Sequence, residues 1–201
     1  MPRRLVPRSA ARLPLLALVL SLVAPPAAPA APPLALDWPA LEAALERYLA
    51  APGDATADGV ASMLPPGATI ALPADPGVDA VRERIFRQLG PIDRALREGA
   101  PGAAKVAFAL RKTSDGEFAR LLDEALGGVL ATRTVEVFRG MQARPEVVLG
   151  GCRFASALPR GMTLADEMRE LEKRRAAVKA VDDAAFQRER VCAQLELDRA
   201  L

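Results

Sequence analysis

The sequence predicts an all-α domain of short helices with a long, charged helical region near its C-terminal end. The chain is rich in Ala and Leu, which favour helices, and poor in β-branched runs. Apolar residues recur at spacings of three and four, and Pro and Gly interrupt these segments at short intervals. Residues 76–98 and 101–131 look like two successive helical hairpins without an exact repeat period. We therefore expect an array of short helical hairpins, either solenoid-like or an orthogonal bundle.

The N-terminal residues have the pattern of a secretion signal. Residues 1–12 carry four arginines and no acidic residue, and residues 13–24 form an apolar stretch. That stretch is shorter than the roughly 20 residues that a membrane-spanning helix needs. Signal peptidase prefers small residues at −3 and −1 and accepts Pro poorly after the cut, so we expect cleavage between Ala30 and Ala31. A retained signal anchor is the alternative.

This cleavage divides the chain into three parts and sets its location. Residues 1–30 are a cleaved secretion signal, residues 31–36 a flexible Pro/Ala leader, and residues 37–201 a single helical domain. The protein is then periplasmic or secreted, without a stable membrane anchor. Four of the 27 basic residues lie in the signal and all 25 acidic residues follow it, so the net charge changes from +2 to −2. This charge speaks against a nucleic-acid partner.

The first expected helix begins after Asp37, a favourable N-cap, and ends at Pro52-Gly53. A short helix follows over residues 56–64. Residues 65–77 are the longest irregular connection, in which residues 69–72 fit one short extended segment between prolines.

Asp75-Pro76 opens the next helix, whose apolar side continues to Leu89. Gly90-Pro91 predicts a break before a two-turn helix over residues 92–98. A further Pro/Gly break comes before an apolar helix over residues 103–112.

The strongest helical pattern follows Ser114, which forms a capping box with Glu117, and continues to Leu130. Residues 134–141 fit a helix or a strand because they contain β-prone side chains. Residues 145–149 fit a further short helix.

Residues 152–161 are expected to form a structured loop. Thr163, with Asp166 three positions later, starts the long charged helical region, which breaks or restarts at Asp182-Asp183. We expect its last part to continue the apolar side of the helix through these residues: Phe186, Val191, Leu195 and Leu197.

Cys152 and Cys192 are the only cysteines. Export places them in an oxidising compartment, where an even number of cysteines favours a disulfide. The bond would close a loop of about 41 residues and stabilise the fold by roughly 4 kcal/mol. Two buried free thiols are an alternative, whereas the lack of a Cys-x-x-Cys motif argues against a redox pair.

The sequence indicates no catalytic, cofactor-binding or metal-binding residues. It contains no histidine, the usual general base and the commonest metal ligand. The mature serines are Ser62, Ser114 and Ser156; none starts a Ser-x-x-Lys motif, and Ser114 is better explained as a helix cap. No phosphate-binding glycine loop or calcium-binding loop is present, so we expect no cofactor.

Charged groups offer two further candidates. Acid–base hydrolysis of a glycosidic bond uses a pair of carboxylates, and the adjacent pairs here are Asp123-Glu124 and Asp182-Asp183. Neighbours on a helix diverge by about 100°, so neither pair is expected to face one bond. The preferred interpretation of these residues is surface charge and helix capping. Five arginines would suit an anionic partner, although nearby acidic residues favour a salt-bridged face. These arginines are Arg82, Arg84, Arg87, Arg94 and Arg97. The charged run over residues 167–190 fits a surface that binds a partner helix. The preferred interpretation is an amphipathic helix that packs on its own domain.

The favoured function is a non-catalytic helical binding or scaffold module of the cell envelope, with another envelope protein as its partner. The alternatives are a carboxylate-dependent cell-wall or glycan hydrolase and a small apolar-ligand carrier. Two convergent carboxylates, one with a raised pKa, would favour the hydrolase. A closed cavity between helices would favour the carrier. The sequence leaves the oligomeric state open.

Overall fold

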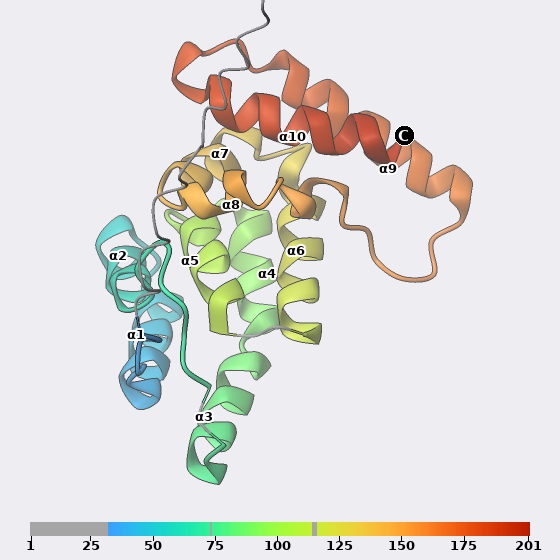
Figure 1. The fold of residues 1–201 in the computed structure, drawn as a ribbon. Helices are drawn as coiled ribbons and strands as arrows, with labels where there is room; N and C mark the ends of the chain where they lie inside the picture. The colour runs from blue at the N-terminus through green and yellow to red at the C-terminus, as the bar shows by residue number, and fades with distance from the viewer. Residues whose placement is uncertain (1–31, 73, 114–115) are drawn as a thin grey trace, which may run out of the picture. The chain divides into compact units, whose positions relative to one another are not determined.

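The fold comes from a computed structural model, which describes residues 32–72, 74–113 and 116–201. The predicted cleavage site at Ala30 and Ala31 lies outside these residues. Within them, helices dominate and no β-strand forms, which confirms the all-α prediction (Figure 1). The α-helices are α1 (Trp38–Ala50), α2 (Asp54–Met63), α3 (Pro76–Arg87), α4 (Leu89–Glu98), α5 (Ala103–Leu110), α6 (Glu117–Leu130), α7 (Thr134–Gln142), α8 (Pro145–Leu149), α9 (Leu164–Ala180) and α10 (Gln187–Ala200). Three 3-10 turns accompany them: η1 (Arg111–Thr113), η2 (Arg153–Ser156) and η3 (Ala184–Phe186).

Several helices begin at the caps that the sequence predicts. The side chain of Asp37 accepts a hydrogen bond from the backbone N–H of Ala40 at 3.0 Å. Asp75 does the same for α3, and Thr163 accepts from the N–H of Asp166 at 3.2 Å to start α9. These caps satisfy backbone donors that have no partner inside the helix.

The start of α4 and the end of α5 differ from the sequence prediction. The helix α4 begins at Leu89 and runs through Gly90-Pro91, where we expected a break. Pro91 lies in the first turn, where its missing N–H removes no intrahelical hydrogen bond. The helix α5 ends at Leu110, earlier than expected, and η1 follows it. Ser114, the expected cap of the next helix, lies outside the described residues.

Residues 134–141, which the sequence left between helix and strand, belong to the helix α7. Its buried side chains Val137, Phe138 and Met141 share one face at helical spacing. Tertiary packing of this face outweighs the strand preference of its valines.

The segment before α1 has a partner in the structure. The N–H of Leu34 donates to the carbonyl of Thr69 at 2.7 Å, and the N–H of Ala71 donates to the carbonyl of Leu34 at 2.9 Å. The expected extended segment over residues 69–72 therefore forms a parallel bridge between Leu34 and Ile70. This contact attaches part of the expected flexible leader to the domain.

The helix α5 lies in the centre of the fold and contacts α2, α4, α6 and α7 (Figure 1). All but one of its residues are buried, because the helix is apolar on every side. Small residues allow its neighbours to approach closely. A Cβ at Gly140 of α7 would lie 2.7 Å from the Cβ of Ala104, and one at Gly102 would lie 2.3 Å from that of Ala57. A repeating hairpin arrangement stays a prediction.

Two arginines are almost completely buried and bond to the ends of neighbouring segments. Arg144 donates to the carbonyls of Ala61 and Leu64 where α2 ends. Arg174 of α9 donates to the carbonyls of Ala155 and Ala157, at 3.1 and 2.8 Å, around the end of η2. Burial lowers the pKa of both guanidinium groups. Each arginine satisfies buried carbonyls that helix geometry leaves without a donor.

The structure joins Cys152, directly before η2, to Cys192 of α10 by a disulfide bond. The two Cα atoms are 5.9 Å apart, within the usual range for a disulfide. Cys152 has a φ of 56°, in the left-handed region that residues other than Gly rarely adopt. The bond ties the turn after α8 to the last helix, which packs beside α9.

Candidate functional site

The two carboxylate pairs from the sequence do not form a shared acid–base site. Asp123 pairs with Arg111, whose Nη2 lies 2.8 Å from its Oδ2, whereas Glu124 pairs with Arg120. Burial raises the pKa of Asp123, and Arg111 partly opposes this rise. The two carboxylates thus pair with different arginines, as expected for diverging neighbours on a helix. Asp182 and Asp183 are exposed, and Asp183 accepts a hydrogen bond from the N–H of Ala185 at the start of η3.

The arginines at positions 82–97 lie mostly in ion pairs. Arg84 binds both carboxylate oxygens of Glu42 and lowers the pKa of that carboxyl. The three other pairs join Arg82 to Asp79, Arg87 to Glu83 and Arg97 to Asp93. Arg94 is exposed and has no ion pair among the described residues. This group therefore has the salt-bridged character that its acidic neighbours predict.

The two serines that the structure describes, Ser62 and Ser156, take part in local contacts. Ser62 donates to the carbonyl of Gly59, and Ser156 contacts the carboxylate of Glu196 at 2.5 Å. Within the described part of the chain, no group of three or more His, Cys, Asp or Glu residues could hold a metal ion. In the same part, no helix is both long enough and apolar enough to cross a membrane.

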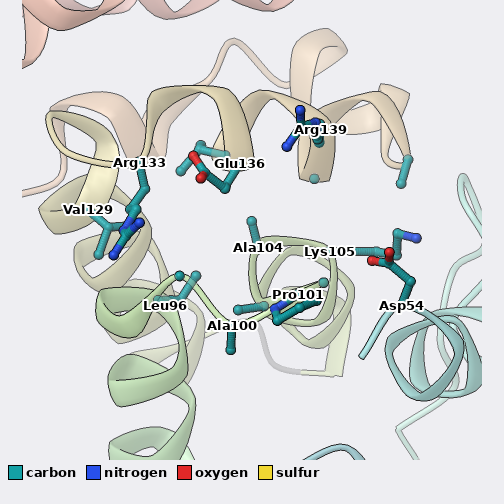
Figure 2. Close-up of a pocket in the computed structure, with 16 residues that line it drawn as sticks. Asp54, Leu96, Ala100, Pro101, Ala104, Lys105, Val129, Arg133, Glu136 and Arg139 are labelled. Atoms are coloured by element: carbon teal, nitrogen blue, oxygen red, sulfur yellow. The ribbon is translucent and has the colours of Figure 1, made fainter. Parts of the chain in front are cut away.

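A pocket of about 560 Å³ lies where α7 crosses the start of α5 and the end of α4 (Figure 2). We call it the α5–α7 pocket. Small and apolar residues, including Ala100, Pro101 and Ala104, form its floor. Its charged side chains have both signs: Asp54, Lys105, Arg133, Glu136 and Arg139.

Two of these charged side chains form contacts that join segments of the fold. Arg133 donates to the carbonyl of Glu98 at 3.3 Å, at the end of α4, and Lys105 pairs with Asp58 at 2.6 Å. Glu136 and Arg139 are exposed and have no ion pair among the described residues. Because the pocket has five charged side chains of opposite signs, its lining differs from the apolar cavity of a lipid or hydrocarbon carrier.

The second surface is a groove of about 640 Å³ along α10, which we call the α10 groove. The end of α8 and the turn η3 form its other walls. Its lining consists of Val148, Gly151, Ala184, Ala185, Gln187, Arg188, Val191, Cys192, Leu195 and Arg199.

Two opposite faces of α10 carry apolar residues. Ala193 and Leu197 are buried against the domain. Val191 and Leu195 are 48% and 54% exposed, although the sequence analysis placed them with Leu197 on one apolar side. That expectation was wrong because positions 191 and 195 point about 120 to 160° away from positions 193 and 197 on a helix. The spacing separates the two pairs on the helix, but it does not say which pair is buried.

Basic residues flank the exposed apolar pair. Arg188 lies three positions before Val191, and Arg199 lies four positions after Leu195. Both arginines are exposed and have no ion pair or hydrogen bond with another described residue. Lys179 and Arg190 line a smaller adjoining pocket beside Val191 and Leu195. Among the described residues, no Asp or Glu lines either pocket, so this surface is basic as well as apolar.

Contacts from three directions hold the α10 groove in place. The Cys152–Cys192 bond fixes one wall to the turn after α8. The side chain of Gln142 on α7 donates to the carbonyl of Ala185 at 2.7 Å, which holds η3. Arg190 donates to the carbonyl of Val181 at 2.9 Å, which joins α10 to the end of α9. These contacts fix the walls of the groove, which reduces the ordering that a partner would have to impose.

Comparison with known proteins gives no relative: no protein-family model, no curated protein and no solved structure matches the chain.

Proposed function

We propose that the chain is an exported, non-catalytic binding or scaffold module of the cell envelope, and that the α10 groove binds another envelope protein. The exposed pair Val191 and Leu195, between the unpaired Arg188 and Arg199, is the observation that carries this proposal. Exposed apolar side chains gain free energy when a partner removes them from water. Arginine beside apolar residues is typical of surfaces that bind proteins.

Sequence and fold support the export part of the proposal. The arginine-rich start, the short apolar stretch and the small residues around Ala30 and Ala31 have the pattern of a cleaved signal. A disulfide between the only two cysteines suits an oxidising compartment such as the periplasm or the extracellular medium. The expected array of helical hairpins would present the groove at its C-terminal end.

The contacts of the acidic residues favour binding over hydrolysis. A carboxylate-dependent hydrolase needs two carboxyl groups that face one glycosidic bond. Asp123 and Glu124 have separate arginine partners, and Asp183 caps a turn. The α10 groove, in contrast, combines apolar and unpaired basic groups on one surface, which suits recognition.

Site-specific photocrosslinking in the producing cells tests the proposal. A crosslinking amino acid at Val191 should capture a discrete envelope protein, and Leu195→Asp should abolish this product. The matched control is the same amino acid at Leu164, which is 73% exposed on α9 and does not line the groove. Hydrolysis of wall fragments by the purified protein, with no specific crosslink from Val191, would overturn the proposal. Equal products from Val191 and Leu164 would also contradict it.

A further inference from the structure

We infer that the α10 groove takes one acidic, amphipathic helix of the partner protein, with its apolar side on Val191 and Leu195 and its carboxylates on Arg188 and Arg199. This inference rests on the proposed function and names the chemistry of the partner's binding segment.

The spacing along α10 defines the length of the bound segment. Arg188, Val191, Leu195 and Arg199 follow one another at intervals of three, four and four residues, so they share one side of the helix. Eleven residues at 1.5 Å each place the two arginines about 16 Å apart along the axis. A partner helix of about three turns spans this distance with apolar residues in the middle and a carboxylate near each end.

The charges around the groove select an acidic partner. The acidic residues of α10 have other roles: Glu189 is buried on the opposite side, and Glu196 binds Ser156. Asp198 accepts a hydrogen bond from Gln194 at 2.8 Å. Arg188 and Arg199 thus have no carboxylate to neutralise them among the described residues. A guanidinium group binds a carboxylate through two parallel hydrogen bonds, which gives both attraction and orientation.

The concave shape favours a protein helix over a membrane surface. Val148 of α8 and Ala184 and Ala185 of η3 line the same groove as Val191 and Leu195. A ridge of side chains on a helix can enter such a groove. Membrane association would instead need the apolar residues of α10 to enter the lipid interface as the exposed face of a helix. An anionic membrane is therefore a separate outcome of the test.

Fluorescence anisotropy with designed helical peptides tests the inference on the purified, oxidised protein. The acidic peptide has Leu at the central positions of one face and Glu eleven residues apart at its ends; the basic peptide replaces both Glu by Lys. The acidic peptide should bind, and Arg188→Glu with Arg199→Glu should weaken it by about tenfold or more. The same double variant should gain binding of the basic peptide. Arg94→Glu, at an exposed arginine without an ion pair outside the groove, should change neither affinity.

Other results would overturn the inference. Equal binding of both peptides to the unaltered protein would exclude charge recognition. Binding to vesicles of anionic phospholipid that depends on Val191 and Leu195, without peptide binding, would identify a membrane surface. A dimer in sedimentation that Leu195→Asp dissociates would identify a second copy of the chain as the occupant. If the acidic peptide fails while Val191 still crosslinks an envelope protein, the proposed function stands and the acidic-helix inference falls.

Discussion

Arginine makes many of the polar contacts that hold distant segments of this domain together. Arg144 and Arg174 are buried, and both use planar guanidinium groups to bond several backbone carbonyls. Arg111 forms a paired contact with Asp123, whose side chain is only 16% exposed. Lys would supply one compact ammonium group at these places and would not match two separated acceptors equally well. The excess of Arg over Lys therefore has a structural use at these sites.

The half-buried carboxyl of Asp123 should titrate above the usual range of aspartate. Burial raises its pKa more than Arg111 lowers it. Between the ordinary value, about 4, and the raised one, the native state binds more protons than the unfolded state. The contribution of Asp123 to the free energy of unfolding therefore falls as pH rises through this interval. Carbon-13 NMR of the carboxyl should give the raised midpoint, and Arg111→Gln should raise it further. A midpoint below the ordinary value would show that the ion pair outweighs burial.

At the scale of elements, the contact between α5 and α7 depends on a missing side chain. Gly140 lies directly against Ala104, and a Cβ there would also approach the backbone N of Lys105 to 3.0 Å. The same contact places Arg133, Glu136 and Arg139 above the start of α5 in Figure 2. Gly128 of α6, in contrast, has no such neighbour within 4 Å. The two helical glycines thus provide a matched pair of sites for substitution by alanine, one in close packing and one in open space.

Gly140→Ala should destabilise the domain, although alanine favours helices more than glycine does. The new methyl group must push α5 and α7 apart, at a cost of about 1–3 kcal/mol. Gly128→Ala has open space around its Cβ and should stabilise α6 by about 0.5–1 kcal/mol. Urea unfolding of both variants, compared at equal m-values, measures these effects. An increase in stability for Gly140→Ala would contradict the close packing.

The helix α10 shows how one element acquires two apolar faces. Glu189, Ala193 and Leu197 recur every four residues and face the domain, whereas Val191 and Leu195 form a second pair on the other side. A helix that only covers its own core has one apolar face and one polar face. The second pair lies outside the side that faces the domain, and it is the pair on which we propose that a partner binds.

At the scale of the whole molecule, the disulfide connects the two halves of the C-terminal region. Cys152 lies before η2 and Cys192 in α10, with α9 between them in sequence. The bond closes a loop whose ends are 40 residues apart. It also holds α10 against the turn after α8, so it supports the α10 groove as well as the fold.

Replacing both cysteines by serine should lower the free energy of unfolding by roughly 4 kcal/mol, the value for closure of a loop of this length. Native mass spectrometry with and without a thiol-blocking reagent first establishes that the purified protein has no free thiol. Urea unfolding of the double variant and of the oxidised protein then measures the difference. Free thiols in the native protein, or equal stability of the two forms, would contradict a structural bridge.

The sequence determined the features that depend on neighbouring residues. Asp37, Asp75 and Thr163 cap helices because their side chains reach a backbone N–H two or three residues later. The apolar stripe from Phe118 to Leu130 identified α6. The disulfide was predicted from the even number of cysteines and the expected oxidising compartment alone. The all-α class follows from such local preferences summed along the chain.

Only the tertiary structure decided which residues meet across long separations. It pairs Leu34 with Ile70, gives Asp123 an arginine of its own, and leaves Val191 and Leu195 exposed beside α8 and η3. Periodicity states which residues share a face of a helix, but burial of that face depends on the element that packs against it. For this reason the sequence by itself determined the helices and a candidate disulfide, whereas the α10 groove became visible only once the helices were packed together.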